Sequence, residues 1–180
     1  MKKFEEKTIS SEQIFSGKVI NLQVDEVELP NGKTSRREII KHPGAVAVIA
    51  ITPDQKLVMV EQYRKALEKS IIEIPAGKLE QGEEPALTAR RELEEETGYE
   101  CENLELILSF YTSPGFADEI VYLYEATGLT KKEQPAACDE DEFVEVLEIT
   151  VEEAERYIKE QRIHDAKTAY AVQYMKMKMK

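Results

Sequence analysis

The segment from Gly77 to Tyr99, GKLEQGEEPALTARRELEEETGY, constrains the fold of this chain more than any other part. The apolar run at 71–74 stops just before it, at a Pro-Ala-Gly sequence that predicts the end of a strand. Glu84 and Pro85 suit a helix entry, because proline at the first helical position lacks only an N–H that the helix does not use. Gly98 can take the left-handed conformation that closes a helix. The segment is therefore predicted to be a loop followed by a helix that ends at Gly98.

The predicted helix gathers three carboxylates, those of Glu92, Glu95 and Glu96, at one edge of its buried side. The apolar stripe beside them consists of Ala86, Ala89, Leu93 and Thr97. Like charges four residues apart destabilise a helix by about 0.2–0.5 kcal/mol, so a positive group is expected between Glu92 and Glu96. Mg²⁺ suits this place, since it is usually shared between one or two carboxylates and substrate phosphates. A solvated acidic helix face is the alternative, and these residues alone leave both interpretations open.

Composition and charge limit the class of protein. A chain of 180 residues and 20.6 kDa corresponds to one domain, or to a core with an appendage. The net charge of −12 argues against nucleic acid and anionic membranes as partners, and it implies that divalent cations help a polyphosphate to approach. The start MKKFEEKTIS lacks a signal-peptide core and no later run has the length of a membrane span, so the cytoplasm is expected.

Residues 4–42 are predicted to form a separate antiparallel unit. Its three strands are expected at 4–15, 18–29 and 34–41, with Asn31-Gly32 as the hairpin turn between the last two. Three strands of this size are marginally stable alone, so the unit is expected to pack on the main domain or on a second subunit. We therefore predict an N-terminal unit at 1–43 and a main domain at 44–180.

The main domain is predicted to alternate strands and helices. Further strands are expected at 45–51, 57–63, 70–74, 104–111, 118–126 and 143–149. Two helices follow, one from Thr150 to about Gln161 and one from about Ala166, with the closing MKMKMK as a fraying terminus. Tyr63, Tyr111 and Phe116 are base-stacking candidates, although aromatic residues on strands are more often core. His42 and His164 fit no ligand pattern and receive no role.

The segment 77–99 also resembles the Nudix hydrolase signature at each of its nine fixed positions. These are Gly77, Glu83, Arg91, Glu92, Leu93, Glu95, Glu96, Gly98 and Tyr99. The resemblance implies an α/β/α sandwich with a mixed sheet, and hydrolysis of a nucleoside diphosphate linked to another group. It also implies that Glu92, Glu95, Glu96 and the carbonyl of Ala76 hold Mg²⁺, with Mn²⁺ as the alternative ion. By the same resemblance Arg91 orients a carboxylate.

Residues outside the signature are similar to the ADP-ribose pyrophosphatase branch of that family. The marker is Pro114, which lies 16 residues after Gly98, although Ser113-Pro114-Gly115 could also be an ordinary turn. Substrate contacts are implied for Arg36, Arg37, Arg64, Ser113, Pro114, Gly115 and Glu119. The catalytic base is implied in the acidic loop, at Glu140 with Glu142 as the second choice.

The branch implies a homodimer that exchanges its N-terminal strands, and a defined reaction. The expected reaction is Mg²⁺-dependent hydrolysis of ADP-ribose to AMP and ribose 5-phosphate. One alternative is hydrolysis of another nucleoside diphosphate sugar, such as GDP-mannose. A second alternative, disfavoured because the signature carboxylates are all present, is a domain that senses ADP-ribose without cleaving it.

Overall fold

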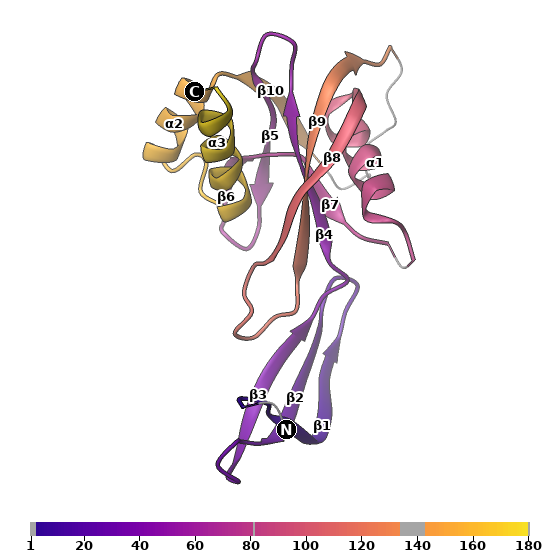
Figure 1. The fold of residues 1–180 in the computed structure, drawn as a ribbon, viewed down its shortest axis with the longest axis vertical. Coiled ribbons are helices and arrows are strands. Elements are labelled where there is room, and N and C mark those ends of the chain that lie inside the picture. The colour runs from indigo at the N-terminus through magenta and orange to yellow at the C-terminus, as the bar shows by residue number, and fades with distance from the viewer. Residues whose placement is uncertain (1–2, 81, 134–142, 180) are drawn as a thin grey trace. The chain divides into compact units, whose positions relative to one another are not determined.

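The computed structural model describes residues 3–80, 82–133 and 143–179 (Figure 1). The chain divides into two compact units, and each is described by itself. The first unit comprises Met1–Gly44 and Phe110–Val121, and the second comprises Ala45–Ser109 and Tyr122–Lys180. The segment 110–121, which the sequence placed within the main domain, thus clusters with the N-terminal residues.

The N-terminal residues of the first unit form the predicted three-stranded antiparallel sheet. Its strands are β1 (Lys7–Ser16), β2 (Asn21–Glu28) and β3 (Thr34–Lys41), in the order β1-β2-β3. Gly32 turns the β2–β3 hairpin with a φ of 78°, a conformation in which a side chain would be strained. The Asn-Gly signal for this hairpin is therefore confirmed.

The second unit is built around a seven-stranded mixed sheet whose central path runs β10-β5-β4-β9-β8, while β6 pairs with β5 and β7 with β4. Its strands are β4 (Ala45–Ile51), β5 (Leu57–Arg64), β6 (Lys69–Glu73), β7 (Ala76–Lys78), β8 (Tyr99–Tyr111), β9 (Ile120–Lys131) and β10 (Val144–Ile149). Helix α1 (Pro85–Thr97) covers one face, and α2 (Val151–Lys159) and α3 (Ala166–Lys178) cover the other (Figure 1). The predicted α/β/α sandwich is confirmed.

Helix α1 begins at Pro85 and is closed by Gly98, as predicted from these two residues. Pro85 occupies its first turn, and Gly98 closes it with a φ of 72° and an N–H that donates to the carbonyl of Glu94 at 2.8 Å. Ala89 and Leu93 are fully buried against a core that includes Val46 of β4. This packing fixes the rotation of α1 about its own axis and hence the direction in which its acidic edge points.

The C-terminal MKMKMK segment was expected to fray. In the structure most of it is helical, because α3 continues through Lys178. Met175 is fully buried, Lys176 forms an ion pair with Glu155 of α2, and Lys178 forms one with the buried Glu125 of β9. The expectation was wrong because the alternation of Met and Lys gives no helical pattern in the sequence, although Met175 is buried in the core while Met177 and Met179 are exposed.

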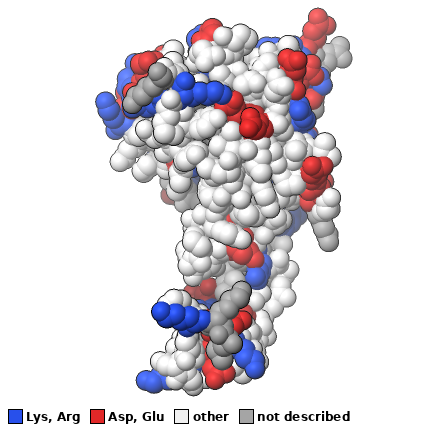
Figure 2. Space-filling view, in the orientation of Figure 1, with Lys and Arg blue, Asp and Glu red and all other residues white. Residues whose placement is uncertain are grey.

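The charges of the chain are distributed over its surface. In the view of Figure 2, acidic and basic side chains are interspersed over the elements of both units, so the net charge of −12 is not gathered in one field on this face. Within the described parts of the chain, none of the helices is both long enough and apolar enough to cross a bilayer.

Replacing Met175 with alanine is expected to lower the free energy of unfolding by about 2–5 kcal/mol, because it leaves a cavity in the core beneath α3. Urea denaturation followed by circular dichroism measures this change. The matched control is Met177→Ala two residues later, where the side chain is 65% exposed and a change within about 0.5 kcal/mol is expected. Equal effects of the two substitutions would show that the last turns of α3 are frayed in solution.

Candidate functional site

Two carboxylates of α1 lie buried against the backbone of β7. Glu92 is 8% exposed and Glu96 is 4% exposed. Oε2 of Glu96 accepts a hydrogen bond of 2.9 Å from the N–H of Ala76. A Cβ atom on Gly77 would lie 1.9 Å from Cδ of Glu92, so this carboxylate occupies the space that glycine leaves open. The predicted strand, loop and helix thus bring Ala76, Gly77, Glu92 and Glu96 together.

Arg91 supplies positive charge along the acidic edge of α1. Its Nη1 lies 2.8 Å from Oε1 of Glu92 and 2.8 Å from Oε2 of Glu95, and its Nη2 lies 3.3 Å from Oε2 of Glu83. Burial lowers the pKa of Arg91, but the contacts with these carboxylates outweigh burial and raise it. The hydrogen bond from Arg91 also lowers the pKa of Glu83. Arg91 therefore joins three of the acidic residues that the sequence pattern singled out.

The residues at β7 and α1 fit a hard divalent cation. Within the described ranges, no three acidic, histidine or cysteine side chains converge as a ready-made metal site. Mg²⁺, however, is commonly held by one or two carboxylates together with phosphate oxygens, and carbonyl oxygens are equally suitable donors. Buried Glu92 and Glu96 beside the backbone of Ala76 provide such oxygens, and the space at Gly77 lets a carboxylate reach this backbone.

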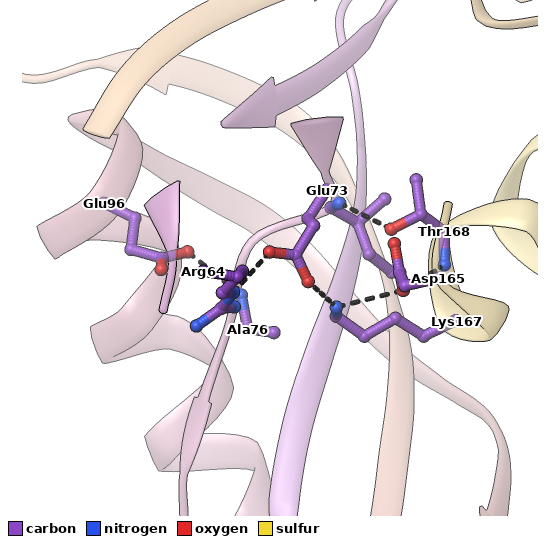
Figure 3. Close-up of polar contacts among 8 residues, drawn as sticks. Arg64, Glu73, Ala76, Glu96, Asp165, Lys167 and Thr168 are labelled. Carbon is purple, nitrogen blue, oxygen red and sulfur yellow. Dashed lines mark hydrogen bonds and ion pairs between the residues drawn. The ribbon is translucent and has the colours of Figure 1, made fainter. Parts of the chain in front are cut away.

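Arg64, the substrate candidate on β5, belongs to a chain of polar contacts (Figure 3). Its Nε donates to Oε2 of Glu73 at 2.6 Å, and Lys167 binds the other carboxylate oxygen of Glu73. Lys167 also donates to Oδ1 of Asp165 at 3.0 Å. Burial lowers the pKa of Arg64, but Glu73, Glu96 and Asp165 raise it overall.

Arg64 was predicted from the sequence, but Glu73, Lys167 and Asp165 were not. A signal for Glu73 was present, since it is the single charged residue in the apolar run IIEI at 71–74. A charge in such a strand is costly unless it is paired, so partners could have been sought. Lys167 and Asp165 carried no comparable signal, because only the packing of α3 brings them to β6.

The other substrate candidates lie in the first unit. Arg37 forms a two-pronged ion pair with Glu6, at 2.9 Å from Nε and 2.6 Å from Nη2, and this contact lowers the pKa of Glu6. Arg36, its neighbour on β3, is exposed. Glu119 accepts a hydrogen bond of 2.5 Å from Thr112.

The Ser113-Pro114-Gly115 segment forms a turn that is tied to β3. The carbonyl of Ser113 accepts hydrogen bonds from the N–H groups of Phe116 and Ala117, at 3.1 and 2.9 Å. Ile40 in turn donates its N–H to the carbonyl of Phe116 at 2.7 Å, and Lys41 pairs with Asp118 at 2.9 Å. These contacts fix the segment to the end of β3.

His42 was given no role, but the structure places it beside a candidate residue. Its Nδ1 accepts a hydrogen bond from the N–H of Gly44 at 3.1 Å, and its Nε2 lies 3.8 Å from Glu119. An Nδ1 that accepts a hydrogen bond carries no proton, so the neutral ring holds its proton on Nε2, toward Glu119. Glu140 and Glu142, the candidates for the base, lie outside the described residues.

Of the two interpretations of Tyr63, Tyr111 and Phe116, the structure excludes the one in which they are core residues. Their exposed fractions are 56%, 56% and 54%, because each lies near the end of a strand or in a turn. Tyr63 also lines an open cavity of about 520 Å³ over the ends of β5, β6 and β10. The described residues that line it include Phe143 but none of the α1 carboxylates.

Two family models match this chain, one over the N-terminal sheet and one over most of the remaining residues. Residues 41–171 match the NUDIX domain, and residues 6–40 match the nucleoside diphosphate sugar hydrolase N-terminal domain. A methanol dehydrogenase activator of Bacillus methanolicus is 70% identical over 98% of this chain and 95% of its own length. An ADP-ribose pyrophosphatase of Bacillus subtilis (strain 168) is 62% identical over 99% of this chain and 96% of its own.

A solved structure has the same fold. The crystal structure of an ADP compounds hydrolase matches with a TM-score of 0.83 and covers 97% of this chain and 94% of that chain. The sequence identity in this match is 17%, so the match concerns the fold alone.

Gly77→Ala is expected to leave the protein folded but to weaken its affinity for Mn²⁺ by about tenfold or more. Losses of this size, about tenfold or more, are typical when a group that orients a metal ligand is removed. The new Cβ would collide with the carboxylate of Glu92. This flexible side chain can rotate away at little cost to folding, but its carboxylate then no longer lies beside the backbone of β7. Electron paramagnetic resonance of free Mn²⁺ measures the affinity. Gly115→Ala adds its Cβ in open space and is the control. An unchanged affinity in Gly77→Ala would mean that Glu92 does not bind the ion.

Proposed function

This chain belongs to the Nudix family, and we propose that it hydrolyses the diphosphate bond of ADP-ribose, releasing AMP and ribose 5-phosphate. The observation that most supports this proposal is the pair of buried carboxylates, Glu92 and Glu96, against the backbone of Ala76 and Gly77. Two acidic groups buried on one helix face need positive charge nearby, and a divalent cation would add to the charge that Arg91 supplies at Glu92. The choice of ADP-ribose is supported by the nearly full-length similarity to the Bacillus subtilis enzyme.

The reaction requires a divalent cation, for which we propose Mg²⁺, with Mn²⁺ as a substitute. Glu92, Glu95, Glu96 and the carbonyl oxygen of Ala76 would hold it. When bound, such an ion neutralises phosphate charge and lowers the pKa of a bound water. Arg91 holds Glu92 and Glu95 through its Nη1, which fixes their carboxylates when the cation enters.

The remaining candidate residues bind the substrate or accept a proton from the attacking water. Guanidinium groups suit phosphate and base recognition, so Arg36, Arg37 and Arg64 contact the nucleotide and diphosphate. Ser113, Pro114 and Gly115 contact the substrate, and Glu119 contacts its terminal ribose. Glu140, or else Glu142, accepts a proton from the attacking water. A new phosphorus–oxygen bond forms to that water, and the bond between the attacked phosphorus and the bridging oxygen breaks.

We further propose that the protein works in the cytoplasm as a homodimer, with residues 1–43 as the dimerisation unit and residues 44–180 as the hydrolase domain. The exposed side chains along all of β1 support a partner at this strand, because an open edge is usually covered. Its negative charge disfavours binding to nucleic acid and to anionic membranes.

Incubation with Mg²⁺ and, separately, ADP-ribose, GDP-mannose, NADH, diadenosine polyphosphate and dGTP is expected to give AMP and ribose 5-phosphate from ADP-ribose as the preferred reaction. Glu96→Gln is expected to lower turnover by about two to three orders of magnitude, while its amide oxygen can still accept from the N–H of Ala76. Ion chromatography of the products measures both.

Glu140→Gln is expected to abolish the fall in rate at low pH that protonation of the catalytic base causes, and Glu142→Gln is expected to retain it.

The outcomes of this panel separate the competing functions. Cleavage of GDP-mannose with ADP-ribose untouched would favour another nucleoside diphosphate sugar as substrate. Tight binding of ADP-ribose without cleavage of any compound would favour the sensor. A rate in Glu96→Gln equal to that of the unaltered protein would contradict the assignment of the α1 carboxylates.

A second candidate function is activation of an alcohol dehydrogenase. It is favoured by the similarity to the Bacillus methanolicus activator, which exceeds the similarity to the Bacillus subtilis pyrophosphatase. The same site serves both functions if activation depends on the hydrolysis that the α1 carboxylates support.

Addition of the purified chain and Mg²⁺ to a methanol dehydrogenase is then expected to raise the rate of methanol oxidation, measured by the formation of formaldehyde. The Glu96→Gln variant should fail to activate, since it lacks the hydrolytic site. Activation by this variant equal to that by the unaltered chain would assign the effect to binding alone, and no activation by either would exclude this second function.

A further inference from the structure

Glu73 is a buried charge with two cationic partners. It is 3% exposed on β6, and its two carboxylate oxygens are divided between Nε of Arg64 and Nζ of Lys167. A buried carboxylate needs such pairing, because removal of one partner leaves an uncompensated charge in the interior. The two partners come from different elements, β5 and α3, so Glu73 joins the central sheet to the start of the last helix.

Arg64 is held at one end and open at the other. Among the described residues, its hydrogen bond is made through Nε, while its side chain is 40% exposed and its terminal nitrogens carry the remaining donors. Figure 3 shows the guanidinium between Glu73 and Glu96, and the charge of Glu96 acts on Arg64. Arg64 thus has an acidic neighbour on each side, one of which belongs to the candidate cation site.

These side chains form a line in which the sign of the charge alternates: Glu96, Arg64, Glu73, Lys167 and Asp165. Asp165 caps α3, because its Oδ1 accepts a hydrogen bond of 3.1 Å from the N–H of Thr168. The hydroxyl of Thr168 in turn accepts from the N–H of Ile74 at 3.1 Å. The far end of the line is therefore anchored in backbone of both α3 and the β6–β7 connection. Rigid anchoring of this kind orients a functional arginine.

We infer that Glu73, braced by Lys167, is a positioning residue that holds the Arg64 guanidinium beside the α1 carboxylates, with its terminal N–H groups directed to the diphosphate of the substrate. Without Glu73, Glu96, whose charge already acts on Arg64, would become a competing acceptor, and a pair between them would withdraw Arg64 from the substrate and occupy a cation ligand. This inference rests on the proposed function for its substrate, but the anchoring of Arg64 does not depend on it.

A double-mutant cycle on ADP-ribose hydrolysis tests whether Glu73 acts through Arg64. Glu73→Gln preserves shape and removes the charge, and is expected to raise KM about tenfold, as is Arg64→Ala, while the double variant raises KM no further. Glu155→Gln, which breaks the ion pair between α2 and α3, is the matched control and should leave KM unchanged. Independent, multiplicative effects of Glu73→Gln and Arg64→Ala on KM would overturn the inference.

A second readout needs no catalysis. The Nε–H group of Arg64 should give a slowly exchanging signal in a ¹H–¹⁵N NMR spectrum, assigned by its loss in Arg64→Lys, because that proton is bonded to a buried carboxylate. Glu73→Gln should make the exchange at least about tenfold faster, and Glu155→Gln should not. Unaltered exchange in Glu73→Gln would also overturn the inference.

The two readouts separate failure of the inference from failure of the proposed function. If the unaltered protein does not hydrolyse ADP-ribose, the proposed substrate is wrong, and the Nε–H exchange still decides whether Glu73 holds Arg64. Should Glu73→Gln not fold, Lys167→Met replaces it, since loss of the brace is expected to raise KM and speed the exchange in the same directions. An unchanged KM and exchange in Lys167→Met would then contradict the proposed brace.

Discussion

The burial of two like charges on one helix face is the constraint on which the rest of the site depends. Glu92 and Glu96 are almost inaccessible to solvent, yet each is a group that water stabilises strongly when ionised. The structure compensates them with the backbone N–H of Ala76 and with Arg91. These partners are directional and few, so the helix, the short strand β7 and the loop between them must hold a single mutual arrangement.

The same rule of pairing extends from α1 to the opposite side of the sheet. Arg64 lies between an acidic residue of α1 and Glu73 of β6, and Lys167 binds Glu73 from α3. Each charge in this line has a neighbour of opposite sign, which lowers the cost of placing it at low solvent exposure. The line therefore connects the two helical layers through the strands that bear the candidate site.

Much of the site was predictable because it depends on local sequence. Pro85 and Gly98 bound α1, and the helical period placed Glu92 and Glu96 on its buried edge. The same logic failed for MKMKMK, where Met175 is core and its neighbours are ion-paired. That outcome depended on Glu155 and Glu125, which lie far away in the sequence.

The sequence by itself determined helix α1 and the acidic edge of the candidate cation site, because turn residues, caps and helical spacing act over a few residues. It also placed an Asn-Gly hairpin in the N-terminal sheet, for the same local reason. Only the tertiary structure decided which side chains meet: Glu73 with Arg64 and Lys167, and His42 with Glu119. Long-range pairs of this kind follow from how strands and helices pack, and no local pattern in the chain encodes that packing residue by residue.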